Sequence, residues 1–365
     1  MTSHRPVSNL TVLSKMIERS VLKQLTAYME THHLFDPNQS AYRSSHSTET
    51  LLTYVTDLAL KNLDNNSNTA LLMLDLSAAF DTLDHDIMLH TLEYHFGIRG
   101  SALRWFRSYL SDRSQSVTLS RYSSPSLEVS YGAPQGSVLA GPLFCMFMRP
   151  LQHVITKHQN ILYQSYADDS QLIFSFKTEN SADVTKLSQC INDIKQFMQS
   201  HLLKLNDDKT ELLIITKPKV DFHITIEIGN CNITSAPFIR NLGILFDRHL
   251  SFQNQVDKLV QVLSYQLRLL AQIRRKLTDQ ACHMFLQYYY LFKTRILYST
   301  VEWHVKLYFV QTSKLQNRAA RILSGHPYRH PITPTLNNLG WLKIHNLVKY
   351  KTLLQTFNAE VPEVG

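Results

Sequence analysis

Two adjacent aspartates between short apolar segments constrain this chain more than any other feature of its sequence. Asp168 and Asp169 lie between residues 161–166 and 171–176, which both read as strands, so the pair is expected at a hairpin tip. Two neighbouring carboxylates repel each other, and a divalent cation relieves that repulsion. Ordinary turn chemistry is the competing interpretation, and for the pair taken alone it is the stronger one, because aspartate favours turns.

A third aspartate, Asp75, follows a fully apolar run over residues 70–74 that predicts a buried strand. A lone carboxylate there is costly to desolvate unless it is paired or binds a metal. Taken alone, Asp75 is more often a residue at the start of a helix. Together with the hairpin pair it predicts a three-carboxylate site for Mg²⁺, of the kind that serves two-metal phosphoryl or nucleotidyl transfer. This prediction requires side chains far apart in the sequence to converge.

Helix and strand alternate in the first part of the chain, and an all-helical part follows from about residue 252 to 323. Residues 39–47 are polar and serine-rich, which predicts a loop. The remaining elements follow from apolar periodicity. The predicted helices are 12–29, one beginning at Ser47 or Thr48, 87–95, 102–110 and 184–203, and the further strands are 115–119, 127–130 and 211–216.

Positive charge is concentrated toward the C-terminal end. The chain has a formal net charge of +8, whereas residues 258–329 hold twelve Lys and Arg against two acidic residues, a local net of +10. A basic region suits a polyanion such as nucleic acid, although a solvated helix face explains the charge equally well. Four scattered cysteines suggest neither a zinc site nor disulfides, and no apolar stretch could span a bilayer. An intracellular protein, nuclear or cytoplasmic, without a membrane partner is expected.

The segments around the aspartates resemble the catalytic motifs of reverse transcriptases. YADD at 166–169 resembles the YxDD box, LDLSAAFDTLDH at 74–85 the first catalytic motif, and GAPQGSVL at 132–139 the Pro-Gln-Gly motif between them. LKLNDDKTELL at 203–213 resembles the lysine-bearing palm motif, and NLGILFD at 241–247 the primer grip. Residues 5–19, 34–50, 97–117, 315–325 and 330–344 resemble the jockey-like branch of LINE-type, non-LTR retrotransposons.

The resemblance implies an α+β right-hand polymerase with fingers, a palm with a small antiparallel sheet, and a helical thumb. The implied reaction is RNA-directed addition of deoxynucleotides to a primer 3′-hydroxyl, with an RNA template, a DNA primer and dNTPs as partners. Two Mg²⁺ ions are the implied cofactor, which Mn²⁺ could replace. The implied parts are partial fingers at 1–70, a palm at 71–250 with inserted fingers elements at about 86–130, a basic thumb at 251–325 and a C-terminal segment at 326–365.

The resemblance also implies roles for single residues. Asp75, Asp168 and Asp169 match the catalytic carboxylates that bind metal, and Leu76 matches a ligand that binds metal through its backbone carbonyl. Phe80 matches the steric gate, a flat ring that leaves no room for a ribose 2′-hydroxyl. Without the family, ordinary core packing would be the default interpretation of Phe80.

Other matched residues would bind substrate or primer. Gln135 and Gly136 match the nucleotide pocket, where glycine permits close backbone approach. Arg43 matches a fingers arginine whose fork suits triphosphate oxygens, with a plain surface charge as its alternative. Lys209 matches a palm lysine that protonates pyrophosphate, and its alternative is a partner of Asp207 or Asp208. Tyr166 would lie near the primer end, and its alternative is a half-buried aromatic residue of a strand. Leu242 and Gly243 match the primer grip, and their alternative is merely a turn.

Three departures from the family pattern bear on activity. Ala140 precedes Gly141-Pro142 where the family reads SVLGPL, a slip or substitution that could weaken activity. Ala41 stands for the usual glycine, which would strain a turn that needs a positive φ, and Ala133 stands for the usual Val or Ile. The chain opens almost inside the RPVSNL motif and no stretch resembles an endonuclease domain, so an N-terminally truncated enzyme without an endonuclease is expected.

Two rival functions remain open at this point. One is a catalytically weak or inactive relic of a retroelement that still folds and binds nucleic acid. The other is a different palm-type nucleotidyl transferase or a nucleotide cyclase, since paired aspartates serve there too. This last alternative leaves residues 34–50 and 97–117 unexplained.

Overall fold

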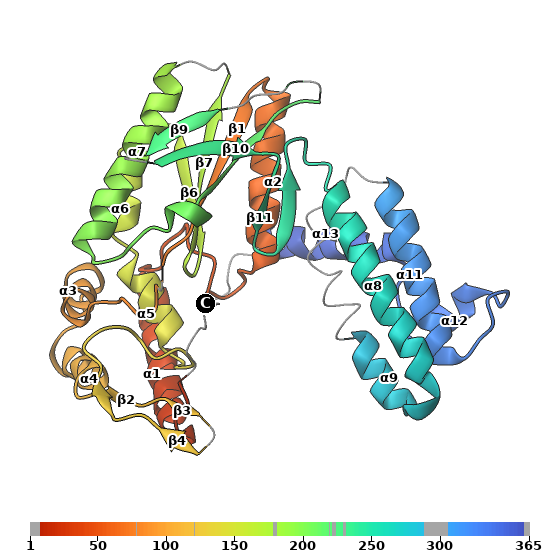
Figure 1. Cartoon of the computed structure of the whole chain (residues 1–365), viewed down its shortest axis with the longest axis horizontal. Coiled ribbons are helices and arrows are strands. Elements are labelled where there is room, and N and C mark those ends of the chain that lie inside the picture. The colour runs from red at the N-terminus through yellow and green to blue at the C-terminus, as the bar shows by residue number, and fades with distance from the viewer. Residues whose placement is uncertain are drawn as a thin grey trace. The chain divides into compact units, whose positions relative to one another are not determined.

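A six-stranded sheet organises the first of two units into which the chain divides (Figure 1). The first unit comprises residues 1–46, 66–214 and 221–236, and the second comprises 47–65, 215–220 and 237–365. The fingers, palm and thumb boundaries stay predictions. The computed structural model describes residues 8–77, 79–119, 121–177, 181–218, 220, 224–228, 231–287 and 306–360.

The sheet has the strand order β6-β7-β1-β8-β10-β9. Strand β7 pairs antiparallel with both β6 and β1, and β9 pairs antiparallel with β10, whereas β10 runs parallel to β8. Helices and a small, largely antiparallel sheet confirm the predicted α+β class. The strands are β1 Asn68–Leu74, β6 Ile161–Tyr166, β7 Asp169–Phe176, β8 Glu211–Ile215, β9 Thr225–Ile228 and β10 Cys231–Ala236.

The central strand β1 is apolar and almost continuously buried, which indicates that both faces of the sheet are covered there. One continuous core joins it to the helices of the first unit, through side chains such as Leu72, Phe144 and Ile191. The predicted strands at 70–74, 161–166 and 211–216 and the predicted helices of this unit are present, with ends shifted by a few residues. The helices are α1 Val12–Thr31, α3 His85–Phe96, α4 Gly100–Leu110, α5 Ala140–Phe147, α6 Leu151–Ile155, α7 Ser181–Ser200 and the short η1 Asp207–Lys209.

The predicted pairing of 115–119 with 127–130 is only partly correct. Strand β2 (Ser114–Gln115) does pair with β5 (Leu127–Glu128), but the residues between them form a second pair, β3 (Thr118–Leu119) with β4 (Tyr122–Ser123). All eight residues are exposed. No buried face therefore holds one longer register.

The second unit is mainly helical in its described residues. Helix α2 begins with a capping box in which Ser47 and Thr50 exchange hydrogen bonds, and Glu49 near its start forms an ion pair of 3.2 Å with Lys351 of α13. Helix α8 packs on α11 through a stripe of buried apolar residues. The elements are α2 Thr48–Asp64, β11 Phe238–Asn241, β12 Ile244–Asp247, α8 Gln253–Ile273, η2 Arg274–Lys276, α9 Asp279–Leu286, α11 Lys306–Ser324, α12 Ile332–Asn338 and α13 Ile344–Glu360.

The helical character predicted for 252–323 is confirmed for its described part, and residues 288–305 lie outside the described residues. Among the helices that the structure describes, none is long and apolar enough to cross a membrane.

Candidate active site

Strand register brings the three predicted carboxylates to one end of the sheet. The last residue of β1, Leu74, lies opposite Ser170 of β7, so Asp75 follows at the edge where β7 begins with Asp169. Tyr166, the last residue of β6, lies opposite Asp169, and Asp168 lies in the turn between β6 and β7. Residues far apart in the sequence therefore meet at the ends of neighbouring antiparallel strands.

The carboxylate of Asp75 contains a polar atom with unmet bonding capacity. Its Oδ2 is buried and has no hydrogen-bond partner among the described residues. A cation, the Nζ of Lys209, lies 3.5 Å from this oxygen, at the outer limit of a hydrogen bond. A buried acceptor without a partner is destabilising, so this oxygen has the chemistry of a ligand for a cation.

The other two carboxylates differ in exposure, since Asp168 is half-buried and Asp169 is exposed. Among the side chains that the structure describes, no three His, Cys, Asp or Glu groups are arranged to hold a metal ion together. The carboxylate of Asp75 is paired with Lys209. That of Asp168 lies near Tyr42, whose pKa is raised first by burial and then by the charges of Cys145, Asp168 and Tyr166.

The predicted backbone ligand Leu76 is buried in a short antiparallel bridge to Leu205. The Asn206 N–H donates to the Asp75 carbonyl at 2.9 Å, and the Ser77 N–H donates to the Lys204 carbonyl at 2.9 Å. Neither bond uses the Leu76 carbonyl, so these contacts hold the strand end in place without occupying the predicted ligand.

Lys209 lies in η1, and its side chain is mostly exposed. The structure pairs it with Asp75 rather than with Asp207, whose carboxylate forms an ion pair of 3.0 Å with Lys195. Among the described residues no ion pair joins Lys209 to Asp207 or to Asp208, so the sequence alternative of such a pair is wrong. Lys209 is a neighbour of the predicted metal ligands, and its role as a proton donor stays a prediction.

Phe80 and the Gln135 loop contact each other through the backbone. The Ala133 N–H donates to the Phe80 carbonyl at 2.8 Å, and the half-buried Phe80 ring packs on Phe144 with ring centroids 5.1 Å apart. The Gln135 Nε2 donates to both carboxylate oxygens of Asp81 at 3.1 Å. The exposed Gly136 has a φ of 113°, which favours glycine. The predicted gate and pocket residues thus lie on adjoining segments.

Arg43 is not a plain surface charge. Its half-buried guanidinium donates from Nη1 to the Asp36 carbonyl at 2.9 Å and to the Gln39 carbonyl at 3.3 Å, and it lies over the Phe35 ring. The alternative interpretation is therefore wrong, while triphosphate contact stays a prediction. Ala41 is not among the described residues with positive φ; that conformation falls on Tyr42, at 58°. The strain considered for Ala41 therefore does not arise at that residue.

The Ala140-Gly141-Pro142 departure lies at the start of α5, which begins at Ala140 and continues without a break to Phe147. Gly141 lies directly against the side chain of Tyr42 there. A Cβ at this position would lie 2.1 Å from the Tyr42 ring. The departure from the family pattern is thus accommodated at the helix start, where Gly141 lies against Tyr42.

Two residues that support the site escaped the sequence analysis. Glu18 is almost fully buried in α1, and its Oε2 accepts from the Ser137 hydroxyl at 2.6 Å and the Val138 N–H at 2.7 Å. Gln39 is also buried and contacts the turn that bears Asp168. The signal for Glu18 was its place on the face of α1 that also buries Leu25. Gln39 gave no such signal, because it lies in a polar loop.

The predicted primer-grip residues Leu242 and Gly243 lie in the second unit, in the two-residue turn between β11 and β12. Their φ values are 44° and 87°, a left-handed pair of the kind that closes tight hairpins. A leucine at positive φ is unusual. The turn interpretation is therefore correct for the geometry, and a contact with primer stays a prediction.

Similarity to known proteins was found at the level of family and of individual relatives. A family model described as reverse transcriptase (RNA-dependent DNA polymerase) matches residues 1–246. The chain is 27% identical over 337 residues to the probable RNA-directed DNA polymerase from transposon BS of Drosophila melanogaster, covering 89% of this chain and 36% of that protein. It is 25% identical over 263 residues to the RNA-directed DNA polymerase from mobile element jockey of the same species, covering 71% of this chain and 28% of that protein.

These two relatives are far longer than this chain, which spans 36% and 28% of their lengths. Among solved structures, apo telomerase from Candida tropicalis truncated from its C-terminal domain aligns with a TM-score of 0.46 at 13% identity, over 66% of this chain and 45% of that one. The family match covers well over half of the chain, and the relatives confirm the resemblance to jockey-like elements. On this basis the chain belongs to the reverse transcriptase family.

Proposed function

We propose that this chain is an RNA-directed DNA polymerase that adds deoxynucleotides to a primer 3′-hydroxyl by two-metal nucleotidyl transfer. The main observation behind this proposal is the strand register, by which Asp75 lies at the same end of the sheet as Asp168 and Asp169. The buried Asp75 Oδ2, without a hydrogen-bond partner among the described residues, supports a cation there. Family membership supports the same chemistry.

The residues that would hold divalent ions are the three aspartates and the Leu76 carbonyl. Bound Mg²⁺, or Mn²⁺ in its place, would activate the 3′-hydroxyl and neutralise charge on the triphosphate. Lys209 could release Asp75 to the metal and turn its ammonium toward the leaving pyrophosphate, because its flexible side chain is mostly exposed. Its proton would then pass to the pyrophosphate oxygen that loses its bond to the α-phosphorus.

Substrate selection would rest on residues next to the carboxylates. Phe80, braced by Phe144 from one side, would close the space for a ribose 2′-hydroxyl and favour dNTPs. Gln135 and Gly136 would line the nucleotide pocket, Arg43 would face the triphosphate, and Tyr166 would lie near the primer end. Leu242 and Gly243 would form the primer grip.

An RNA template and a DNA primer are the proposed nucleic-acid partners. The second unit presents exposed cations such as Lys258, Arg268 and Arg275 on its described helices. Such side chains bind phosphates without reading sequence, so binding should weaken as salt is raised. The enzyme would act where its template and dNTPs are found, in the nucleus or the cytoplasm.

A second candidate is a folded protein that binds nucleic acid without catalysing synthesis. The observation that favours it is the lack of three converging metal ligands among the described side chains. Under the main proposal, Asp75 would leave Lys209 and would hold the ions together with Asp168 and Asp169. Under the second, the Asp75–Lys209 pair persists.

Primer extension separates the two candidates. Purified protein, confirmed as folded by circular dichroism, is incubated with an RNA template, a DNA primer, dNTPs and Mg²⁺. The main proposal expects DNA product that depends on the RNA template and on the metal. Binding of the template–primer by folded protein, with no extension in Mg²⁺ or Mn²⁺, would establish the second candidate instead.

A further inference from the structure

A short loop segment adds to the free edge of the sheet beside the aspartate turn. Strand β6 is the edge strand, and residue Gln39 forms an isolated parallel bridge with Ser165 of that strand. The Ser40 N–H donates to the Ser165 carbonyl at 2.9 Å, and the Ser165 N–H donates to the Asn38 carbonyl at 2.8 Å. This contact brings the loop alongside Ser165, next to the last residue of β6.

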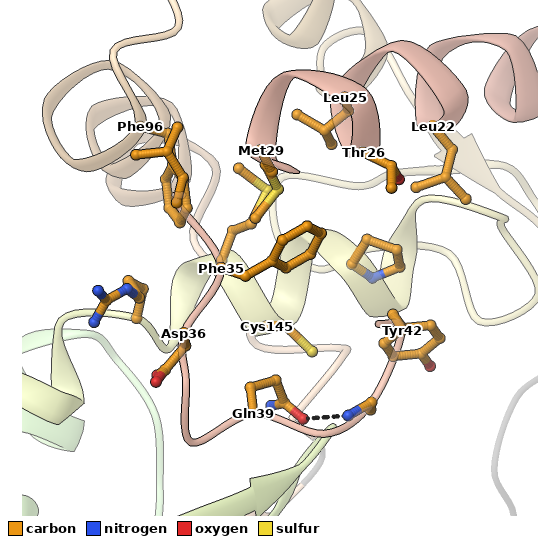
Figure 2. Close-up of a pocket in the computed structure, with 15 residues that line it drawn as sticks. Leu22, Leu25, Thr26, Met29, Phe35, Asp36, Gln39, Tyr42, Phe96 and Cys145 are labelled. Carbon is orange, nitrogen blue, oxygen red and sulfur yellow. Dashed lines mark hydrogen bonds between the residues drawn. The ribbon is translucent and has the colours of Figure 1, made fainter. Parts of the chain in front are cut away.

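From this position the Gln39 side chain holds one residue of the turn at two points. Its Oε1 accepts from the Ala167 N–H at 2.9 Å, and its Nε2 donates to the Ala167 carbonyl at 3.3 Å. The same Oε1 accepts from the Ala41 N–H at 2.9 Å, the bond drawn in Figure 2. The residue as a whole is only 6% exposed, so water has little access to these bonds.

Ala167 is the residue of the turn that most needs such support. Its φ is 57°, a left-handed conformation that residues other than glycine, asparagine and aspartate rarely adopt. Alanine has no polar side chain with which to stabilise that conformation locally. The Gln39 amide binds both the N–H and the C=O of this residue, and so fixes the direction in which the chain continues to Asp168.

The same loop residue is also bonded to a second predicted site residue. The Gln39 carbonyl accepts from Nη1 of Arg43, which also donates to the Asp36 carbonyl. Gln39 thus connects the predicted triphosphate-binding arginine through its backbone with the aspartate turn through its side chain. A residue that only filled the loop would need neither contact with Ala167.

We propose that Gln39 is a positioning residue of the active site, which holds the Ala167 turn so that Asp168 presents its carboxylate to the catalytic metal. This proposal rests on the proposed function, because it takes Asp168 to be a metal ligand. The bland alternative is that Gln39 only satisfies the buried backbone groups of its own loop. The two differ in their consequences for metal binding.

Three variants make the test. Gln39→Met keeps the length and unbranched shape of the side chain and removes all three hydrogen bonds. Gln39→Glu keeps an oxygen that accepts from the Ala167 N–H and the Ala41 N–H but loses the donor to the Ala167 carbonyl. Gln164→Met is the matched control, because Gln164 lies on the same strand edge and donates to Asn38 Oδ1 at 3.4 Å without touching the turn.

Two readouts do not depend on turnover. Mn²⁺ affinity is measured on the folded full chain by electron paramagnetic resonance, and amide hydrogen exchange is followed by mass spectrometry over the peptide that spans 165–170. Gln39→Met is expected to raise the Mn²⁺ dissociation constant by about 10–100-fold, as for other residues that orient a metal ligand. It should also speed exchange in that peptide, whereas Gln39→Glu should retain protection at the Ala167 amide. Gln164→Met should match the wild type in both.

Steady-state primer extension supplies a third readout. Gln39→Met should need more Mg²⁺ for half-maximal rate and lose kcat, with little change in affinity for the template–primer. Equal Mn²⁺ affinity and equal exchange in Gln39→Met and Gln164→Met would overturn the positioning role. If Gln39→Met fails to fold, Gln39→Glu provides the test instead. This variant keeps the oxygen that accepts from the Ala167 N–H, so rapid exchange of the Ala167 amide in it would count against the proposal.

Failure of the proposed function gives a different result. A wild-type chain that binds no Mn²⁺ and extends no primer removes Asp168 as a metal ligand, and the proposal for metal positioning falls with it. Extension by the wild type together with unaltered Mn²⁺ binding in Gln39→Met refutes the role of Gln39 alone.

Discussion

The two sides of the candidate site are held by different kinds of structure. The aspartate turn at 165–170 is continuous with two antiparallel strands, whose register sets the positions of its residues. The loop at 132–139 contains no strand ladder. Its position depends on a few specific contacts, with Phe80 and Asp81 at its start and with Glu18 at its end.

The difference predicts how each side responds to substitution. A regular ladder spreads its hydrogen bonds over many residues, so changing one exposed or half-buried carboxylate at its end should alter chemistry and leave the fold intact. A loop held by a few buried contacts has no such redundancy. Loss of one contact there should lower the stability of the protein before it alters any chemical step.

The largest expected effect is that of Asp168→Asn at the strand end. Asparagine keeps the size of the side chain but removes the charge that would bind a divalent ion, which supplies several kcal/mol to the transition state. Since each 1.36 kcal/mol is tenfold, primer extension should fall by at least about 100-fold. Binding of the template–primer and the thermal unfolding midpoint should be close to those of the wild type.

The control for this variant lies on helix α7, where Asp193→Asn removes a half-exposed carboxylate that pairs with His158 at 2.8 Å. Extension by Asp193→Asn should stay near the wild-type rate. Retained extension by Asp168→Asn would contradict its assigned role, and its unfolding would contradict the expectation that changing a carboxylate at the strand end leaves the fold intact.

Sequence patterns captured the first side of the site because its determinants are local. Apolar runs before Asp75 and around the aspartate pair specify strands, and turn-forming residues specify where the strands end. The pairing of Leu74 with Ser170 then follows from burying both strands in one core. Family resemblance supplied the roles of these residues, which periodicity alone left as turn chemistry.

The supporting contacts could not be read in the same way, because each joins residues far apart in the sequence. Gln39 lies 128 positions from Ala167, and Glu18 lies 120 positions from Val138. A polar residue in a loop and a charged residue in a helix are ordinary in sequence. Only the fold shows that both are buried. The sequence likewise did not show that Lys209 pairs with Asp75 instead of a neighbour such as Asp207, because Asp75 is also far from Lys209 in the sequence.

The next largest effect is expected from Gly132→Ala at the start of the loop. Gly132 has a φ of 87°, and a Cβ there would lie 2.9 Å from the Asp81 carbonyl oxygen and 3.0 Å from that of Phe80. Backbone atoms cannot move aside as a side chain can. Left-handed strain together with overpacking should lower the free energy of unfolding by about 3 kcal/mol.

Gly100→Ala separates the two causes. Gly100 also has a positive φ, 60°, but a Cβ there meets nothing within 4 Å. Chemical denaturation should show a loss of only about 1 kcal/mol for this control. Equal losses in both variants would mean that the close approach to residues 80 and 81 contributes nothing, and the comparison between ladder and loop would lose its main support.

A smaller loss of stability is expected at the other end of the loop from Glu18→Ala. This change leaves the Val138 N–H and the Ser137 hydroxyl without their carboxylate acceptor. Hydrogen bonds to a charged group contribute about 1.5–3 kcal/mol, so the free energy of unfolding should fall by about 2 kcal/mol. Glu30→Ala, at an exposed position of the same helix, should change it by less than about 0.5 kcal/mol.

Glu18→Gln tests whether hydrogen bonding by Glu18 is sufficient without its charge. The amide oxygen of glutamine can accept from the Val138 N–H, and its nitrogen can donate to the Ser14 hydroxyl. Its loss should therefore be smaller than that of Glu18→Ala. If both variants unfold at the wild-type denaturant concentration, the loop is held by contacts other than Glu18.

The smallest effect is a pH dependence of stability at Asp36, in the loop that contacts β6 and the aspartate turn. Burial raises the pKa of this carboxyl above its usual 3.8, against the opposing effects of the Asn38 N–H, Arg149 and Arg43. Asp36 and Gln39 also line the pocket shown in Figure 2. Between the usual and the raised pKa the folded chain binds more protons than the unfolded chain. The contribution of Asp36 to stability therefore falls as pH rises through that window.

Asp36→Asn removes this titration, and its amide oxygen can still accept from the Asn38 N–H, a bond of 2.9 Å in the wild type. The difference in unfolding free energy, wild type minus variant, should therefore be most positive at pH values below the usual pKa of 3.8 and should decline as the pH rises through the raised pKa. Denaturant titrations of both proteins at matched pH values measure it. A difference that rises with pH would mean that the charges of Arg149 and Arg43 outweigh the effect of burial on the Asp36 carboxyl. The loop that contains Asp36 would then be held by charge pairing, as Glu49 is held by Lys351, rather than by backbone hydrogen bonds.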